Sequence, residues 1–478
     1  MLRRTKLVVT LGPATDDAVS LEKMLLAGVD MVRVNFSHGS KEEHAARINA
    51  VRECAKKHDR VVAVMADLQG PKIRVARFLE GKIMLVNDAE FTLDAAWDSK
   101  SGNQDCVGID YKELPQDVFP DDTLLLDDGR IVLQVIDVVA SKIRCKVVVG
   151  GELSNNKGIN RLGGGLSAGA LTDKDRVDLQ IATDLDVDYI AISFPRTADD
   201  MLEARKLVDA AGGQLIGLVA KIERTEAVAN IDEIIEASDA VMVARGDLSV
   251  EIGDAEVPAV QKEIIRRARD LNCPVITATQ MMESMIHSSV PTRAEVSDVA
   301  NAVLDGTDAV MLSAETAVGK HPDVVVAAVT RACLGVEKHP VAHRQKHRGD
   351  IRFTRVDEAI AAATMYAANH LQIAAIIALT ESGGTPLWMS RIRTGIPVFG
   401  LSRLPKTRAK MCLYRGVYPI EFDVTNKNRD EVNREAVAEL EKRGHVKKGD
   451  LVIITKGDHM GVLGGTNAMK IVQVGEVI

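Results

Sequence analysis

Eight short apolar segments, each ending in polar or charged residues, recur along the chain as far as residue 316. They are KLVVTLG (6–12), MVRVNFSHG (31–39), VVAVMADL (61–68), YIAISF (189–194), LIGLVAKIE (215–223), AVMVARGDL (240–248), PVITATQ (274–280) and AVMLSAET (309–316). Continuous aliphatic and β-branched runs between helix-like stretches are typical of buried parallel strands. Eight of them predict a (β/α)8 barrel, whose functional residues lie at the C-terminal ends of its strands.

The polar residues at the ends of these segments are predicted to share strand faces. Side chains at positions i and i+2 lie on the same side of a strand. This spacing groups Arg33 with Asn35 and Ser37, Lys221 with Glu223, Arg245 with Asp247, Thr277 with Thr279, and Ser313 with Glu315. A barrel mouth lined in this way suits a small anionic substrate and a metal ion.

The interval between the third and fourth barrel strands is far longer than one βα unit requires. It contains short alternating segments at 82–86, 123–139 and 142–150, and its DDG sequence at 127–129 is a hairpin signal. We therefore predict a small β-barrel domain at 71–168, inserted into a catalytic barrel formed by 1–70 and 169–340. The glycine-rich stretch 163–171 is a predicted hinge, so the insert could close over the mouth as a lid that excludes water.

The chain changes character again after the last barrel segment. A basic, histidine-rich stretch, HPVAHRQKHRGD (339–350), is predicted to be a solvent-exposed connector between domains. Helical and strand patterns then alternate over 350–478, including the apolar segments AAIIALT, IPVFGLS and DLVIITKGD. This alternation predicts a separate open α/β domain.

Composition narrows the functional classes. The 478 residues carry a net charge of −8 and only 3% aromatic residues, which argues against a nucleic-acid binder. No apolar run reaches membrane-spanning length, and MLRRTKLVV enters the first strand without the features of a signal peptide. The six cysteines are scattered, without a Cys-x-x-Cys pair, so we expect reduced thiols in a cytoplasmic protein. They are Cys54, Cys106, Cys145, Cys273, Cys333 and Cys412.

The strongest chemical signal is AKIERTEA (220–227) followed by VARGDLSVE (243–251). Glu223 and Asp247 are carboxylates at the ends of adjacent strands, and such oxygen ligands suit Mg²⁺. Lys221 beside them could stabilise an oxyanion or a phosphoryl group. A buried ion-pair network without a catalytic role remains the alternative for this cluster alone.

Two further segments carry candidate chemistry. In RVNFSHG (33–39), Arg33 could hold a phosphoryl oxygen through two hydrogen bonds, while Phe36 reads as core. In ADLQGPKIRV (66–75), Asp67 ends a strand, and the Gly-Pro turn leads into the inserted domain.

These segments, together with ITATQMMESM and PTRAEVSDVANAVLDGTDAVMLSAET, closely resemble the pyruvate kinase family. The resemblance covers the whole chain and is to the bacterial form. It implies phosphoryl transfer from phosphoenolpyruvate to ADP, giving pyruvate and ATP in the last step of glycolysis. It also implies a homotetramer that requires Mg²⁺, or Mn²⁺ in its place.

The resemblance also implies individual roles. Arg33 and Lys221 would contact the transferring phosphoryl group, and Glu223 and Asp247 would ligate the metal. The backbone N–H groups of Ala244, Arg245 and Gly246, together with Thr279, would hold the substrate carboxylate. Thr279 and Ser313 would belong to the relay that protonates the enolate. The residues facing the ADP phosphates would be Asn35, Ser37, His38, Arg74 and Lys174.

One departure from the family pattern predicts that K⁺ is not required. Many members hold K⁺ near a Gly-Pro-Glu motif, whereas this chain reads Gly70-Pro71-Lys72, with Leu68-Gln69 in place of Thr-Lys. The Lys72 ammonium could supply the missing charge near Asn35, Ser37, Asp67 and Leu68. The alternative is that Lys72 points into solvent.

The C-terminal segment LTESGGTP (379–386) lies between a predicted strand and helix and resembles the family's allosteric phosphate loop. Its anion-binding groups would be Thr380, Ser382, Gly383, Gly384 and Thr385. Glu381 lies within the loop, which favours a sugar monophosphate or AMP over fructose 1,6-bisphosphate. GDHMGVLGGTN (457–467) is the predicted facing loop.

Two other functions remain open at this point. A metal-dependent barrel lyase or aldolase acting on a pyruvate enolate would share the metal and Lys221, but it gives no reason for a hinged lid. A catalytically silent metabolite-binding regulator is the other alternative. ADP-dependent product formation would distinguish the kinase from both.

Overall fold

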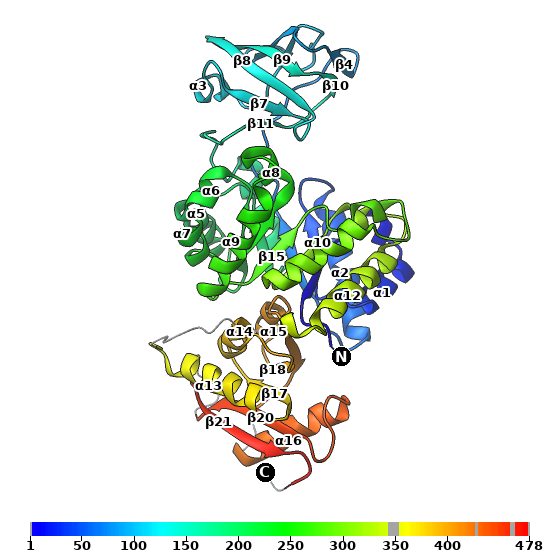
Figure 1. Ribbon diagram of the computed structural model, residues 1–478, viewed down its shortest axis with the longest axis vertical. Helices are drawn as coiled ribbons and strands as arrows, with labels where there is room; N and C mark the ends of the chain where they lie inside the picture. Colours follow the sequence, from blue (N-terminus) through cyan, green and yellow to red (C-terminus); the bar gives the residue numbers. More distant parts are fainter. Residues whose placement is uncertain (1, 343–352, 426–428, 459–463, 477–478) are drawn as a thin grey trace.

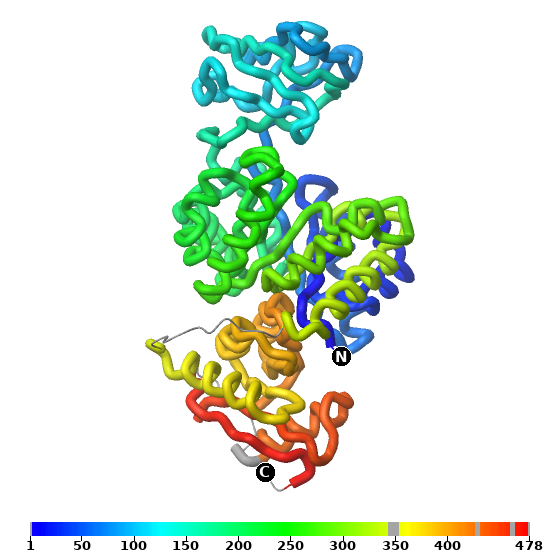
Figure 2. Tube along the Cα trace, in the orientation of Figure 1, coloured from blue at the N-terminus to red at the C-terminus, as the bar shows by residue number. Residues whose placement is uncertain are grey.

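The computed structural model describes residues 2–342, 353–425, 429–458 and 464–476 and arranges them as three domains in a row (Figure 1). The inserted β domain and the C-terminal domain lie at opposite ends of a central barrel. The same order is visible in the Cα trace of Figure 2.

Within the described residues, eight parallel strands close into the predicted barrel in the order β1-β2-β3-β12-β13-β14-β15-β16. Side chains such as Met65, Tyr189 and Met242 fill the inside, and a second apolar layer joins the strands to the surrounding helices. The strands are β1 (Lys6–Thr10), β2 (Met31–Asn35), β3 (Ala63–Asp67), β12 (Tyr189–Ile192), β13 (Gly217–Ile222), β14 (Ala240–Ala244), β15 (Val275–Ala278) and β16 (Ala309–Leu312).

The helices around the barrel begin with side-chain caps where the sequence provides them. Ser40, Thr172 and Thr292 each form a capping box with the acidic residue three positions later. The helices are α1 (Ala18–Leu26), α2 (Lys41–Lys57), α4 (Asp173–Asp184), α5 (Ala198–Ala210), α6 (Thr225–Ala229), α7 (Ile231–Glu236), α9 (Val257–Asp270), α10 (Arg293–Asp305) and α12 (Pro322–Glu337).

Several strands end earlier than their apolar segments suggest. β14 ends at Ala244, and helix α8 (Arg245–Ile252) begins at once, so the prediction that Arg245 and Asp247 share a strand face is wrong. The pairing of Thr277 with Thr279 is also wrong, because Thr279 lies beyond β15 at a φ of 70°. Likewise, Ser313 and Glu315 belong to the start of the short helix α11 (Ala314–Ala317).

The inserted domain contains a two-stranded and a six-stranded sheet among its described residues, which enclose one apolar core. The predicted hairpin is confirmed, since Leu126 of β7 pairs with Ile131 of β8 across the DDG turn. The strands are β4 (Lys82–Leu85), β5 (Glu90–Asp94), β6 (Cys106–Gly108), β7 (Thr123–Leu126), β8 (Ile131–Val139), β9 (Lys142–Val149), β10 (Gly151–Ser154) and β11 (Ile159–Arg161), with a helical turn α3 (Leu114–Asp117).

Two glycine segments connect this domain to the barrel. At Gly70, where φ is 69°, a Cβ atom would lie 2.6 Å from the Cβ of Ser193, so the turn requires glycine. On the return path, Gly163, Gly164 and Gly165 all have positive φ values, and the Gly163 N–H donates to the Glu251 carbonyl (2.8 Å). The exit of the inserted domain is thereby tied to helix α8.

The C-terminal domain is the predicted open α/β unit, with the described strand order β19-β18-β17-β20-β21. β21 is antiparallel to its neighbour, and helices cover both faces of the sheet. Its elements are α13 (Val356–His370), β17 (Ile373–Leu379), α14 (Gly384–Arg391), β18 (Val398–Ser402), α15 (Pro405–Met411), β19 (Val417–Glu421), α16 (Arg429–Lys442), β20 (Leu451–Gly457) and β21 (Thr466–Gln473).

This domain packs against the N-terminal end of the barrel, opposite the mouth. Arg391, at the end of α14, forms a fully buried ion pair with Asp308, which directly precedes β16. Lys406 donates to the carboxylate of Asp188, directly before β12 (3.2 Å), and the Tyr189 hydroxyl donates to the Lys410 carbonyl (3.2 Å). The apolar core is continuous across this junction.

Candidate active site at the barrel mouth

Lys221 lies at the centre of the polar cluster at the barrel mouth. Its Nζ donates to the Ser193 hydroxyl (2.7 Å) and lies 3.0 Å from Glu223 and 3.3 Å from Asp67. Burial opposes the charged form, but the two carboxylates outweigh it and raise the pKa of Lys221. Lys221 is therefore a fixed positive charge in a partly buried site.

Arg33 joins the same cluster through Asp67. Its Nε donates to Asp67 Oδ2 (2.5 Å), and Nη1 donates to the Thr10 hydroxyl (3.1 Å). Although Asp67 is buried, the charges of Lys221 and Arg33 hold the pKa of its carboxyl below the usual value. One buried carboxylate thus positions two cations side by side, which is an arrangement suited to a phosphoryl group.

Glu223 and Asp247 are the carboxylates expected to ligate a metal ion. Glu223 is buried, with one oxygen accepting the Phe194 N–H (2.9 Å). Burial, and then the charge of Asp247, raise the pKa of Glu223 to about 7 against the opposing effect of Lys221. A divalent cation would compensate both carboxylates, and hard oxygen donors of this kind are what Mg²⁺ prefers.

These two carboxylates form an incomplete ligand set. Among the described residues, no group of three or more His, Cys, Asp or Glu side chains is arranged to hold a metal. Mg²⁺ is commonly held by one or two carboxylates, with water and substrate phosphate oxygens completing its octahedron. The donor set therefore fits a metal that binds together with a phosphorylated substrate.

Lys72 contacts a different group of residues from the one expected. Its Nζ donates to Asp247 Oδ1 (3.0 Å) and lies 3.8 Å from Asp128 in the lid hairpin. Burial opposes the charged form, but Asp247 raises the pKa of Lys72 overall. The lysine thus joins a proposed metal ligand to the lid, whereas the expectation placed it near Asn35, Ser37, Asp67 and Leu68.

The segment after β15 has an uncommon backbone conformation. Thr279 and Gln280 have positive φ values of 70° and 54°, conformations that are uncommon for non-glycine residues. The Gly246 N–H donates to the Thr279 hydroxyl (2.9 Å), which brings two of the expected carboxylate-binding groups together. The Arg245 side chain binds the Ala278 and Thr279 carbonyls and Asp298, so only its backbone can serve the site.

The remaining expected residues are distributed around the rim. Asn35 accepts the Ser37 N–H (3.1 Å), and His38 is exposed. Lys174 donates to the Phe36 carbonyl (2.8 Å), so it lies beside the RVNFSHG turn. Arg74 enters the lid, where its strand segment pairs with Gly158. The Ser313 N–H donates to Glu315 (2.6 Å) at the end of β16.

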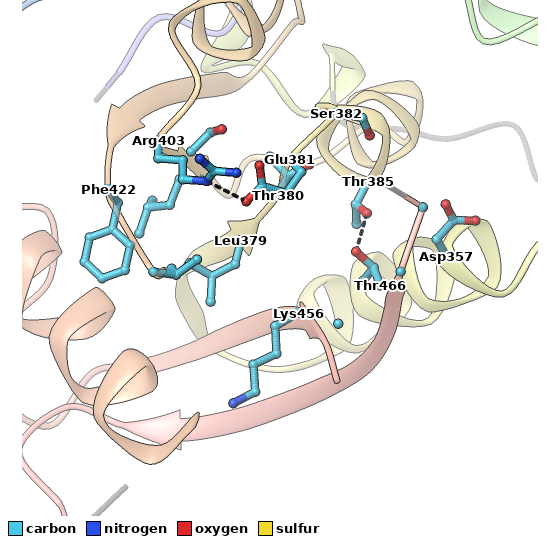
Figure 3. Close-up of a pocket in the computed structure, with 16 residues that line it drawn as sticks. Asp357, Leu379, Thr380, Glu381, Ser382, Thr385, Arg403, Phe422, Lys456 and Thr466 are labelled. Carbon is cyan, nitrogen blue, oxygen red and sulfur yellow. Dashed lines mark hydrogen bonds and ion pairs between the residues drawn. The ribbon is translucent and has the colours of Figure 1, made fainter. Parts of the chain in front are cut away.

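A second pocket lies in the C-terminal domain at the C-terminal ends of β17, β18 and β20 (Figure 3). It encloses about 610 Å³ of empty space, part of it open to solvent, and is lined by Thr380, Ser382 and Thr385 of the expected loop. Gly383 has a φ of 80°, and its N–H donates to the Thr380 hydroxyl (2.9 Å). The Thr385 hydroxyl is bound to Thr466 of β21 (2.8 Å).

Several polar residues in the two sites were missed by the sequence reasoning. Ser193 and Thr10 bind Lys221 and Arg33 at the mouth. In the second pocket, Arg403 pairs with Glu381 (3.3 Å), and Lys456 also lines the wall. A lone serine or threonine after an apolar run gives only a weak signal. Residues 459–463 of the predicted facing loop lie outside the described residues.

Comparison with known proteins decides the family. The family model "Pyruvate kinase, barrel domain" matches residues 2–326, and "Pyruvate kinase, alpha/beta domain" matches residues 358–472. The chain belongs to the pyruvate kinase family. It is 56% identical to Pyruvate kinase II of Salmonella typhimurium over 477 residues, which cover 99% of each chain. It is 54% identical to pyruvate kinase of Haemophilus influenzae over 461 residues, covering 95% of this chain and 96% of the relative.

Membership of the pyruvate kinase family makes the chain a phosphotransferase and confirms the expected architecture. In the described segments of this pyruvate kinase, we find no helix long and apolar enough to cross a membrane. All six cysteines lie in described segments and are free thiols.

Proposed function

We propose that the barrel mouth transfers the phosphoryl group of phosphoenolpyruvate to ADP, giving pyruvate and ATP in the last step of glycolysis. The observation that carries this proposal is the Arg33–Asp67–Lys221 arrangement, in which one buried carboxylate orients two cations. Phosphoryl transfer depends mainly on positioning and charge stabilisation. Lys221 would also stabilise the enolate oxygen that develops as the phosphoryl group leaves.

The other residues would bind and orient the two substrates. Thr279 and the backbone of Ala244, Arg245 and Gly246 lie where helix α8 begins, so backbone N–H groups there could hold the substrate carboxylate. Thr279 and Ser313 would take part in protonation of the enolate. The residues proposed for the ADP phosphates are Asn35, Ser37, His38, Arg74 and Lys174.

Glu223 and Asp247 would hold Mg²⁺, with Mn²⁺ as a chemically similar substitute. When bound, the metal would supply charge neutralisation for the phosphoryl group. Each of the two carboxylates also has a lysine beside it, since Lys221 faces Glu223 and Lys72 faces Asp247. These lysines would offset part of the carboxylates' negative charge.

The second part of the proposal is that activity does not require K⁺. Lys72 supplies a monovalent positive charge to the same carboxylate that would ligate Mg²⁺, at 3.0 Å. Its pairing with Asp128 would let the same charge respond to lid closure. Activity in a buffer that contains neither Na⁺ nor K⁺ tests this point directly.

The third part is that the C-terminal pocket binds an activating phosphorylated metabolite, a sugar monophosphate or AMP. Ser382, Gly383 and Gly384 precede or begin helix α14, where backbone N–H groups favour an anion. Among the described lining residues, Arg403 and Lys456 are balanced by Asp357 and Glu381. A neutral wall suits one phosphate group better than two.

Activation can be tested at subsaturating phosphoenolpyruvate with glucose 6-phosphate, AMP and fructose 1,6-bisphosphate. The first two should activate at lower concentrations than the bisphosphate. Ser382→Asp should abolish activation without changing the maximal rate, because it places a negative charge in the loop. Activation by the bisphosphate at the lowest concentration would overturn the preference for a monophosphate.

We further propose a cytoplasmic homotetramer. The side chains of Val356 and Tyr366 on helix α13 are 65% and 69% exposed, and Ile471 lies exposed on the edge strand β21. Apolar side chains beside an open sheet edge favour contact with another chain. Light scattering after size-exclusion chromatography would measure the mass directly.

The decisive experiment for the reaction is pyruvate formation from phosphoenolpyruvate with Mg²⁺ and with or without ADP. Production that depends on ADP supports the kinase. Pyruvate formed equally without ADP would show hydrolysis of phosphoenolpyruvate to pyruvate and inorganic phosphate, which would refute transfer to ADP. No product under any condition would favour the lyase or the silent regulator.

A further inference from the structure

The segment that leads out of the inserted domain, residues 163–168, is bound to the barrel through its own backbone. The Gly163 N–H donates to the Glu251 carbonyl (2.8 Å), and the Gly165 N–H donates to a carboxylate oxygen of Glu226 (2.5 Å). Glu251 belongs to α8 and Glu226 to α6. This connecting segment is therefore fixed from two elements that begin beside the candidate active site.

Arg224 makes a third contact with the connecting segment. Its Nη1 donates to the carbonyls of Leu166 (3.2 Å) and Ala168 (3.3 Å), and the residue is only 3% exposed. Burial lowers the pKa of Arg224, and the charge of Glu251 opposes this shift. A guanidinium group stays protonated near neutral pH, so a buried cation binds two carbonyls of the segment.

The position of Arg224 in the chain links this contact to the active site, because the preceding residue is Glu223. The backbone of Arg224 is extended, with φ −120° and ψ 152°, and successive side chains of an extended chain point to opposite sides. Accordingly, Glu223 lies 3.0 Å from Lys221 in the site, whereas Arg224 reaches the connecting segment.

Phe194 provides a second link between the same two residues. Its N–H donates to the Glu223 carboxylate (2.9 Å), and its ring lies under the Arg224 guanidinium, 5.5 Å from ring centre to Cζ. A displacement of the connecting segment that moves Arg224 therefore acts on Glu223 in two ways, through the shared peptide bond and through Phe194.

We propose that Arg224 is a positioning residue that couples the placement of the inserted domain to the carboxylate of Glu223. This inference rests on the proposed function, in which Glu223 ligates the metal ion. Coupling between two sites is reciprocal. Binding of the metal together with phosphoenolpyruvate should therefore tighten the connecting segment, and loosening the segment should weaken metal binding.

The first measurement is the affinity of the full chain for Mn²⁺ in the presence of phosphoenolpyruvate, from the EPR signal of the free ion. Arg224→Gln should weaken Mn²⁺ binding by roughly 2- to 30-fold, the range for residues that modulate coupling without touching the ligand. Arg224→Lys keeps the buried charge and should recover part of the affinity. Arg196→Gln is the matched control, because Arg196 donates to the Ser167 carbonyl of the same segment (2.9 Å) from the loop after β12. It should leave Mn²⁺ affinity unchanged.

The second measurement is amide hydrogen exchange of the connecting segment with and without Mn²⁺ and phosphoenolpyruvate. The two ligands should slow this exchange in the wild-type protein and in Arg196→Gln, but not in Arg224→Gln. A purely structural role for Arg224 would speed up exchange without removing the response to the ligands. If Arg224→Gln does not fold, Glu226→Gln, which weakens only the anchor of Gly165, should change both measurements in the same direction.

The outcomes separate this inference from the proposed function. Mn²⁺ affinity that is unchanged in Glu223→Gln would refute the assignment of Glu223 as a metal ligand. Mn²⁺ binding that depends on Glu223 but is as tight in Arg224→Gln as in the wild type would overturn the coupling alone. The same holds if the ligands affect exchange of the segment equally in both proteins, or if Arg196→Gln weakens Mn²⁺ binding as much as Arg224→Gln does.

Discussion

Replacing Lys72 by glutamine removes the charge that we propose takes the place of a bound K⁺, while keeping most of the side-chain volume. In the structure the Lys72 ammonium lies 3.0 Å from Asp247 and 3.8 Å from Asp128. The substitution leaves Asp247 and Glu223 with less positive charge around them. We expect Lys72→Gln to depend on added K⁺ and the wild-type enzyme to be independent of it.

The size of the effect follows from the geometry of the pair. The side chains of Lys72 and Asp247 are 29% and 24% exposed, so solvent screens their attraction only in part. A hydrogen bond to a charged group contributes about 1.5–3 kcal/mol net, which corresponds to roughly 10- to 150-fold in kcat/KM. Asp128 is 70% exposed and adds little to this figure.

The assay follows pyruvate formation in a buffer based on tetramethylammonium, with K⁺ titrated back. Lys72→Gln should lose about 10- to 150-fold in kcat/KM without K⁺ and regain part of it on addition of K⁺. Lys157→Gln is the matched control, because Lys157 forms an ion pair with Asp127 in the same lid hairpin (2.6 Å). Asp127 is not a proposed metal ligand, so the loss of this pair should change kcat/KM less than about fivefold.

The reasoning about Lys72 fails under either of two results. A wild-type enzyme that is inactive without K⁺ would show that the lysine does not replace the ion. A Lys72→Gln enzyme with the same loss as Lys157→Gln would show that any lid lysine has this effect.

Three other variants test separate parts of the molecule. Lys221→Met should lower kcat by at least ~10²-fold in steady-state assays, because it removes the proposed stabiliser of the oxyanion. Burial raises the pKa of Glu251 from 4.5 to about 7, so its proton stabilises the fold at low pH and this stability is lost as pH rises through about 7. Thermal unfolding should therefore find Glu251→Gln more stable than wild type at pH 8, by up to about 3 kcal/mol, and nearly equal at pH 5. Arg391→Met should destabilise the protein by about 3–5 kcal/mol, since it leaves Asp308 buried without its cation.

Each of these expectations has a clear contrary result. Normal turnover by folded Lys221→Met would remove that residue from the reaction. Parallel stability curves for wild type and Glu251→Gln between pH 5 and pH 8 would show that Glu251 does not titrate in this range. For the ion pair, the double variant Arg391→Met/Asp308→Asn should recover part of the loss. A thermal midpoint of the double variant as low as that of Arg391→Met alone would show that the loss of stability does not come from the unpaired charge of Asp308.

The barrel could be predicted because its strands are buried on both sides and therefore read as continuous apolar runs. The ends of those strands could not be located, since the run through Ala244 gives no sign that helix α8 starts at Arg245. β19 contains Pro419 and lies at the sheet edge, where proline is tolerated but weakens the strand pattern. The sequence pattern did not predict β19, and it did not predict α15 or β21 either, because their apolar periodicity is weak.

The candidate sites divide in a similar way. Lys221 and Glu223 are close in sequence, so their proximity follows from strand geometry. The contact between Lys72 and Asp128 depends on how the lid lies against the barrel, which no local pattern encodes. Arg403 and Lys456 reach the second pocket from segments far from its loop. Their position at the pocket could not be predicted without knowing the order of the strands in the sheet.

Helix α14 forms a rigid link between the loop at Gly384 and the base of the barrel. It spans eight residues from Gly384, in the loop proposed to bind phosphate, to Arg391, so it is a rod of roughly 12 Å. Arg391 is held by Asp308, the residue immediately before β16, and β16 runs on to Ser313 at the mouth. A helix and a strand hardly change length. A shift of Gly384 along the helix axis must therefore move the N-terminal end of β16 or bend the junction between the domains.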